Sequence, residues 1–261
     1  MRIVAWNVGH QEFGVRGKPK WSNKELVDTL ETLKADVLFL HEYYRPNEED
    51  QQEEDALLCR AGFECVQRTP VIQRDNKRMR DNRTLVASRD RSMQIVKSAA
   101  DGAPEWALQN YLHVALPGVE IIGLRVPDYR KVPKGLQAHR VWLDRTLQPL
   151  VNGRIIILGD VNADPDSTAK VQKAFFTQMD GSGWRTKTPS GGFPWSYKSR
   201  VNRRSLKQQH KESRIDHAFF GGAFDLDEVQ VRYDDGDDTL TGSLDAAISD
   251  HAALVVELPA T

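Results

Sequence analysis

The feature that most constrains the fold of this chain is a set of short apolar runs that each meet a polar side chain. RIVAWN (2–7), DVLFLHE (36–42) and RIIILGD (154–160) each end on Asn, Glu or Asp. RIDHAFF (214–220) carries an acid inside the run, and ISDH (248–251) adds an acid and a histidine. Runs of this length are typical of strands. A carboxylate at the end of a packed strand loses hydration, which is unfavourable unless a cation or hydrogen bonds compensate it.

The remaining periodicity indicates strands and helices that alternate, although several adjacent strands have no helix between them. Ser22 and Glu25 match a capping box, and the pattern then predicts a helix with Leu26, Leu30 and Leu33 on one face. Further helices are predicted at 48–62, at 135–151 and from near Ser167. Further strands are predicted at 63–68, 84–88, 111–116, 119–126, 228–233 and 251–258. This mixture favours one α/β domain over 1–261, built of sheets with helices on their outer faces.

Composition places the chain among globular proteins. Its 261 residues are 39% hydrophobic and 28% charged, and no apolar run approaches the roughly 20 residues of a membrane span. MRIVAWNVGH (1–10) lacks the features of a secretory signal. Cys59 and Cys65 are the only cysteines, so we expect no disulfide framework, two packing thiols and a cytoplasmic location.

The net charge of −1 argues against a nucleic-acid partner, but the charges are segregated along the chain. Acids gather in 48–55 and 234–238, whereas 74–83 and 197–211 are strongly basic. Segregated charge can build a positive face on a neutral protein. The same segments can equally be ordinary solvated loops.

The polar residues at the strand ends predict an oxygen-rich pocket. Asp160 and Asn162 would point the same way if the backbone is extended, and Asp, Glu and Asn oxygens select Mg²⁺ or Mn²⁺ over zinc. Each piece also has a purely structural reading. Asp160 and Asn162 can form an Asx-turn, residues 164–167 suit a turn and a helix cap, and Asp216 can pair with Arg214.

Five motifs occur together in one order: WN (6–7), LHE (40–42), GDVN (159–162), RID (214–216) and SDH (249–251). This series resembles the endonuclease/exonuclease/phosphatase superfamily. RVPDYR (125–130) and GGFPWSYKSR (191–200) resemble segments of its exonuclease III-like AP endonucleases. The resemblance implies a four-layer α/β sandwich, in which two packed mixed β-sheets are flanked by helices, as in DNase I.

The resemblance also implies hydrolysis of a phosphate ester in a Mg²⁺ site, with Mn²⁺ able to substitute. Glu42 would be the principal metal ligand, with Asn7 and Asp250 beside it. The implied roles of the remaining catalytic residues are water activation by Asp160, support of water and phosphate by Asn162, donation to a phosphate oxygen by His251, and orientation of that histidine by Asp216.

The implied substrate is DNA, cut as an endonuclease or exonuclease, with abasic sites among the implied targets in DNA repair. The implied protein is a monomer without membrane contact. The substrate-binding candidates are Arg125, Phe193, Trp195, Arg200, Arg203 and Arg204. Two departures stand out: Arg125 replaces the tyrosine of that branch, and no lysine follows LHE. The alternatives are a phosphatase or phosphodiesterase acting on RNA, a small molecule or a lipid headgroup, and a binding module without catalysis. The aromatics near 193–195 can also be a hydrophobic plug under a loop.

Overall fold

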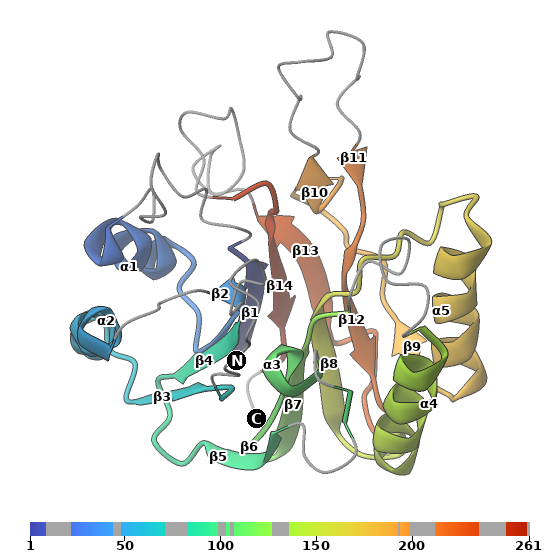
Figure 1. Ribbon diagram of the computed structural model, residues 1–261, viewed down its shortest axis with the longest axis horizontal. Helices are drawn as coiled ribbons and strands as arrows, with labels where there is room; N and C mark the ends of the chain where they lie inside the picture. The colour runs from blue at the N-terminus through green and yellow to red at the C-terminus, as the bar shows by residue number, and fades with distance from the viewer. Residues whose placement is uncertain are drawn as a thin grey trace, which may run out of the picture.

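The computed structural model describes residues 1–8, 22–43, 48–70, 83–98, 103–104, 107–126, 136–192, 194–198, 212–234 and 249–259. Two six-stranded sheets lie face to face, with helices on both outer surfaces (Figure 1). This arrangement confirms the predicted four-layer α/β sandwich. A two-stranded hairpin stands at one end of it.

The first sheet joins both ends of the described chain. Its order is β13-β14-β1-β2-β4-β3, and only the β1–β2 pair is parallel. Its strands are β1 (Arg2–Asn7), β2 (Val37–Tyr43), β3 (Cys65–Arg68), β4 (Arg83–Ser88), β13 (Gln230–Asp234) and β14 (Ala253–Glu257).

The second sheet is built from the middle of the chain. Its order is β5-β6-β7-β8-β12-β9, and only the β7–β8 pair is parallel. Its strands are β5 (Gln94–Ser98), β6 (Tyr111–Leu116), β7 (Val119–Leu124), β8 (Ile155–Asp160), β9 (Arg185–Thr186) and β12 (Asp216–Phe220). The hairpin pairs β10 (Tyr197–Lys198) with β11 (Glu212–Ser213). The short strands β5, β9, β10 and β11 were not predicted, because they carry too few apolar residues to stand out.

Strand alternation sorts the buried side chains into layers. In β1, Ile3 and Ala5 join the core between the sheets, whereas Val4 and Trp6 face the helices. In β8, Ile156 and Leu158 face inward in the same way. Both faces of the central strands are therefore buried, which explains why they read as unbroken apolar runs.

The helices cover the two outer faces (Figure 1). Helices α1 (Asn23–Thr32) and α2 (Glu48–Arg60) pack on the first sheet. Helices α4 (Leu136–Leu147) and α5 (Lys170–Gly181) pack on the second, and the single turns α3 (Ala107–Asn110) and η2 (Gln148–Leu150) precede β6 and follow α4. The predicted capping box is present, since the side chains of Ser22 and Glu25 each accept from the other's backbone N–H.

Two local predictions were wrong. The helix expected from near Ser167 is present and begins at Lys170. The expected cap is wrong, because the N-cap is Ala169, whose side chain offers no acceptor. Ser167 instead accepts a hydrogen bond from the Ala169 N–H at 3.2 Å, within the turn. Cys59 is exposed rather than packed, whereas Cys65 contacts the inner core; both are free thiols.

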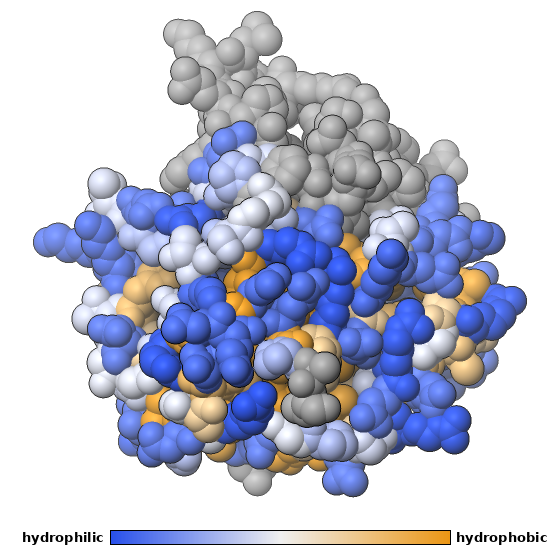
Figure 2. All heavy atoms as spheres, turned by 180° about the vertical axis from the view of Figure 1, so that it is seen from behind, coloured by the Kyte–Doolittle hydropathy of each residue, from blue (hydrophilic) through white to orange (hydrophobic). Residues whose placement is uncertain are grey.

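The face of the protein drawn in Figure 2 is mainly hydrophilic. Figure 2 shows one face, on which apolar side chains form small, separated patches between charged ones. Within the described residues, no helix combines the length and the apolar character that a membrane span requires.

Candidate active site

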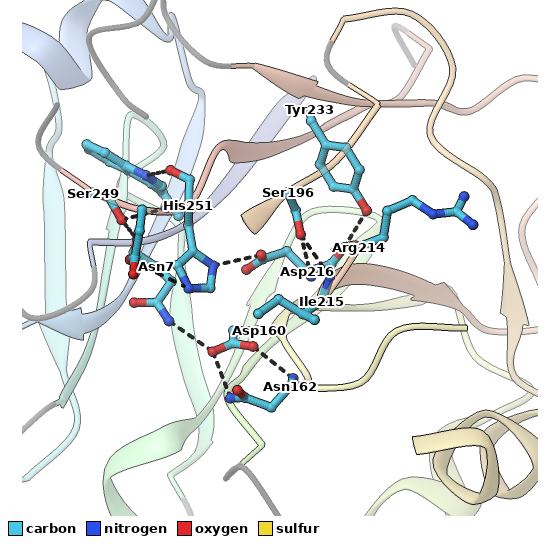
Figure 3. Close-up of polar contacts among 12 residues, drawn as sticks. Asn7, Asp160, Asn162, Ser196, Arg214, Ile215, Asp216, Tyr233, Ser249 and His251 are labelled. Carbon is cyan, nitrogen blue, oxygen red and sulfur yellow. Dashed lines mark hydrogen bonds and ion pairs between the residues drawn. The ribbon is translucent and has the colours of Figure 1, made fainter. Parts of the chain in front are cut away.

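Three strand ends place polar side chains on the face between the sheets. Asn7 continues the inward series of Ile3 and Ala5, and Asp160 continues that of Ile156 and Leu158. Asp216 opens β12 opposite Asp160 in register. Because all three lie at the same end of the sandwich, the inner core gives way there to a cluster of polar side chains (Figure 3).

The amide of Asn7 links the two sheets. Its Nδ2 donates to Asp160 Oδ2 at 2.9 Å and lies 3.5 Å from Glu42 Oε1. Glu42 has the outward parity of Leu38 and Leu40, but it sits at an irregularity of the β2–β4 ladder and has φ +54°. A bulge of this kind re-aims a side chain. The strained backbone therefore brings Glu42 to the inner cluster.

Asp160 and Asn162 meet through a tight turn rather than through extended backbone. Asn162 has φ +48°, and its N–H donates to Asp160 Oδ1 at 2.8 Å. Its Nδ2 donates to Asp160 Oδ2 at 2.9 Å and to Val126 O at 2.8 Å. The predicted extended geometry was wrong at Asn162, but the Asx-turn itself joins the two side chains at the site.

The glycine of the GDVN motif permits close packing behind the site. Gly159 has φ +138°, and a Cβ there would lie 2.3 Å from Leu124 O and 2.5 Å from His41 Nε2. Only glycine fits this backbone conformation and this space. Burial lowers the pKa of His41 to about 4, so His41 is a neutral packing residue beside the site.

His251 and Asp216 form a buried pair from opposite sheets. His251 Nδ1 lies 2.8 Å from Asp216 Oδ2. A carboxylate at Nδ1 fixes the ring orientation and leaves Nε2 for other chemistry. Asp216 does not pair with Arg214, whose guanidinium instead contacts Asp166.

Several backbone contacts hold this pair in place (Figure 3). Ser196 Oγ accepts the N–H groups of Ile215 and Asp216 at 2.9 and 3.0 Å. Tyr233 donates its hydroxyl to Asp216 O at 2.8 Å. On the other side, Trp6 Nε1 donates to His251 O at 2.8 Å, and Ser249 Oγ accepts the His251 N–H at 3.0 Å.

These supporting residues were missed in the sequence. Tyr233 lies in none of the motifs, and Ser196, Ser249 and Trp6 lie in motifs in which other residues are the predicted functional ones. A serine enclosed by Trp195 and Tyr197 is the one signal that marks Ser196, since a small polar side chain between aromatics suggests a buried hydrogen bond.

The charges of the site shift the pKa values of Asp160 and His251 upward. Burial raises the pKa of Asp160 to about 7, and Asp216 adds to the effect. Burial alone would lower the pKa of His251, but the charge and hydrogen bond of Asp216, with Asp250 and Asp160, outweigh it and raise the pKa to about 10. Asp160 is thus poised to exchange a proton near neutral pH while His251 is charged.

The structure places the other predicted site residues as follows. Asp250 Oδ1 lies 4.0 Å from His251 Nε2. Arg125 forms an ion pair with Glu42 through Nη2, and its Nε lies 3.8 Å from Asp160 Oδ2. Trp195 is 8% exposed, which favours the plug reading over an open stacking face. Phe193, Arg200, Arg203, Arg204 and both basic segments lie largely or wholly outside the described residues.

The oxygen donors fit a hard divalent cation in their chemistry. Across the part of the chain that the structure describes, no three His, Cys, Asp or Glu side chains are arranged to hold a metal ion. Glu42 and Asp160 nevertheless approach each other around Asn7, and both are buried. Buried carboxylates with an amide are ligands that suit Mg²⁺. In this structure the guanidinium of Arg125 is the positive charge beside Glu42 and Asp160.

Comparison with solved structures shows where this fold occurs. An AP endonuclease from Archaeoglobus fulgidus superposes with a TM-score of 0.68 at 15% identity, and 100% of each chain is covered. A 3′-5′ exonuclease, NExo, from Neisseria meningitidis gives 0.66 at 16% identity with the same coverage. A Neisseria NExo variant described as a 3′ phosphatase bound to product DNA hairpin gives 0.64 at 17% identity, again over 100% of each chain. No curated protein sequence matches the chain.

The family comparison covers nearly all of the chain. Residues 4–251 match the model of the Endonuclease/Exonuclease/phosphatase family. This span includes the strand ends that carry Asn7, Glu42, Asp160, Asp216 and His251. The chain therefore belongs to the endonuclease/exonuclease/phosphatase family, whose members hydrolyse phosphoester bonds.

Proposed function

We propose that this protein is a Mg²⁺-dependent phosphodiesterase that cleaves DNA, preferentially at abasic sites. The observation that carries the proposal is the meeting of Asn7, Asp160 and the Asp216–His251 pair at one end of the sandwich. The similarity to an AP endonuclease and to a 3′-5′ exonuclease supports DNA as the substrate class.

Asp160 is the base that receives a proton from the attacking water. Its raised pKa matches that task near neutral pH. Asn7 and Asn162 donate to the same carboxylate, at 2.9 Å each, and so hold it in one orientation. A base held in a single rotamer reacts from one position, which lowers the entropic part of the barrier.

His251 serves as the positive donor at the phosphate. Its raised pKa keeps the ring charged, so Nε2–H can donate to a phosphate oxygen or to the leaving oxygen. Asp216 positions the ring through Nδ1 and does not itself touch substrate.

A metal would be held by Glu42 and Asn7, with Asp250 as the third predicted ligand. When bound, such a cation supplies Lewis-acid stabilisation of the phosphate oxygens. The remaining work of positioning water, moving its proton and donating to the phosphate belongs to the side chains of this chain.

A phosphomonoesterase acting on a DNA 3′ end is the second candidate. The structurally similar NExo variant described as a 3′ phosphatase favours it. The burial of Trp195 favours it as well, because a buried indole ring is less accessible to the sugar of an abasic site. The same catalytic residues would serve both reactions.

The test compares four labelled substrates with Mg²⁺ or with EDTA: a duplex with one abasic site, the intact duplex, RNA, and DNA with a 3′ phosphate. We expect Mg²⁺-dependent incision at the abasic site. Asp160→Asn should lower the rate by about 10²–10³ or more, the usual effect of removing such a group. Asp164→Asn is the matched control, because Asp164 belongs to the following turn.

The outcomes separate the candidates. Release of phosphate from the 3′ end without incision would replace the endonuclease by the phosphatase. Full turnover by Asp160→Asn would refute the site. Hydrolysis that persists in EDTA would refute the dependence on metal.

A further inference from the structure

Arg125 neutralises two carboxylates of the candidate site. The residue follows β7, and its N–H donates to Asn110 O at 2.8 Å, which anchors the backbone. Nη2 pairs with Glu42 Oε1, and Nε lies 3.8 Å from Asp160 Oδ2. The Arg125 side chain is 21% exposed, against 9% for Glu42 and 2% for Asp160. A guanidinium near the mouth of the site therefore reaches inward to two buried acids.

The position of the guanidinium conflicts with that of a metal. Two desolvated carboxylates need a counterion, and an arginine side chain is always charged. Arg125 contacts the Glu42 oxygen that lies nearest Asn7, the other predicted ligand. Two positive charges at one carboxylate repel each other, so binding of the cation is favoured when the guanidinium leaves.

The departing guanidinium needs a new partner. Among the described residues, its other acidic neighbour is Asp160, and the nearby Asp216 is already matched in charge by His251. A phosphate group offers the planar fork of Arg125 two acceptor oxygens at once. Because Arg125 is partly exposed, it can turn toward a substrate without any movement of β7.

We infer that Arg125 is an internal counterion which competes with the divalent metal for Glu42 and, once displaced, binds the substrate phosphate. Metal and phosphate then bind with positive coupling, since each favours the same position of one side chain. The coupling is reciprocal: phosphate strengthens metal binding as much as metal strengthens phosphate binding. The inference rests on the proposed metal site and assigns Arg125 a role in the order of assembly.

The experiment measures Mn²⁺ binding to the full chain from the electron paramagnetic resonance signal of the free ion. The variants are Arg125→Met and, as a polar alternative if that variant does not fold, Arg125→Gln. Arg232→Met is the matched control, because Arg232 pairs with Glu257 at 2.9 Å with comparable exposure, on β13. Without the competitor, both Arg125 variants should bind Mn²⁺ more tightly by about 5-fold to 150-fold, the usual range for coupled sites.

A second arm adds thymidine 5′-monophosphate as the phosphate probe. The nucleotide should tighten Mn²⁺ binding to the wild-type chain by at least about 5-fold more than it does in the Arg125 variants. Equal or weaker Mn²⁺ affinity in both Arg125 variants would overturn the inference and leave the proposed function intact. Absence of Mn²⁺ binding from every variant would overturn both, because the metal site itself would be missing.

Discussion

The hydroxyl of Ser196 connects the segment of Trp195 and Tyr197 to the start of the strand that carries Asp216. Ser196 is fully buried, and its Oγ accepts two backbone N–H groups, from Ile215 and Asp216. Ser196→Ala removes the acceptor but keeps the backbone bonds of residue 196, to Ser213 and from Ala252. Two buried donors are left without a partner.

Each unsatisfied buried donor costs about 1–3 kcal/mol, so the variant should lose about 2–6 kcal/mol of its free energy of unfolding. For a chain of this size that corresponds to a fall in Tm of about 4–24 °C. Urea denaturation followed by far-UV circular dichroism measures the loss. Ser167→Ala is the control, since its Oγ accepts one N–H in a partly exposed turn and should cost at most about 1 kcal/mol.

Ser196→Ala should also change the kinetics of phosphoester hydrolysis. Because Asp216 orients His251, a less rigid backbone at Asp216 should reduce kcat more than it raises KM. A loss of less than about 0.5 kcal/mol in Ser196→Ala, the range of a neutral surface change, would refute the role assigned to this hydroxyl.

Two further predictions concern the backbone and the charge of the site. Gly159→Ala should destabilise the fold by about 2–4 kcal/mol, because it adds positive-φ strain to a Cβ that would lie 2.3 Å from a backbone oxygen; a Tm equal to that of the wild type would contradict this. His251→Gln tests the raised pKa of His251. A pKa raised from 6.5 to about 10 stabilises the fold fully below pH 6.5, and the contribution is lost as the pH rises through about 10. The difference in free energy of unfolding between wild type and His251→Gln should therefore shrink over that interval in urea titrations; a constant or growing difference would exclude a charged, Asp216-paired histidine.

Much of the fold was predictable because its signals are local. An unbroken apolar run of strand length is visible within one short stretch of sequence, so runs such as 2–7 and 154–160 were identified correctly. The capping box at Ser22 is a signal of the same local kind. The motifs located Asn7, Asp160 and His251 because a polar residue at the end of an apolar run is visible in any single stretch of sequence.

The geometry of the site depends on contacts that no local pattern contains. The register that sets Asp216 opposite Asp160 joins residues from two distant segments. The bulge that turns Glu42 inward arises from the pairing of β2 with β4.

The sequence by itself thus determined most of the strands, the α/β class and the residue types available for chemistry. Only the tertiary structure decided that Arg125 would lie on Glu42 and that Ser196 would hold the loop of Asp216. The physical reason is that side-chain partners across two packed sheets are selected by register, burial and charge together. Register, burial and the proximity of charges are set only when the two sheets pack together.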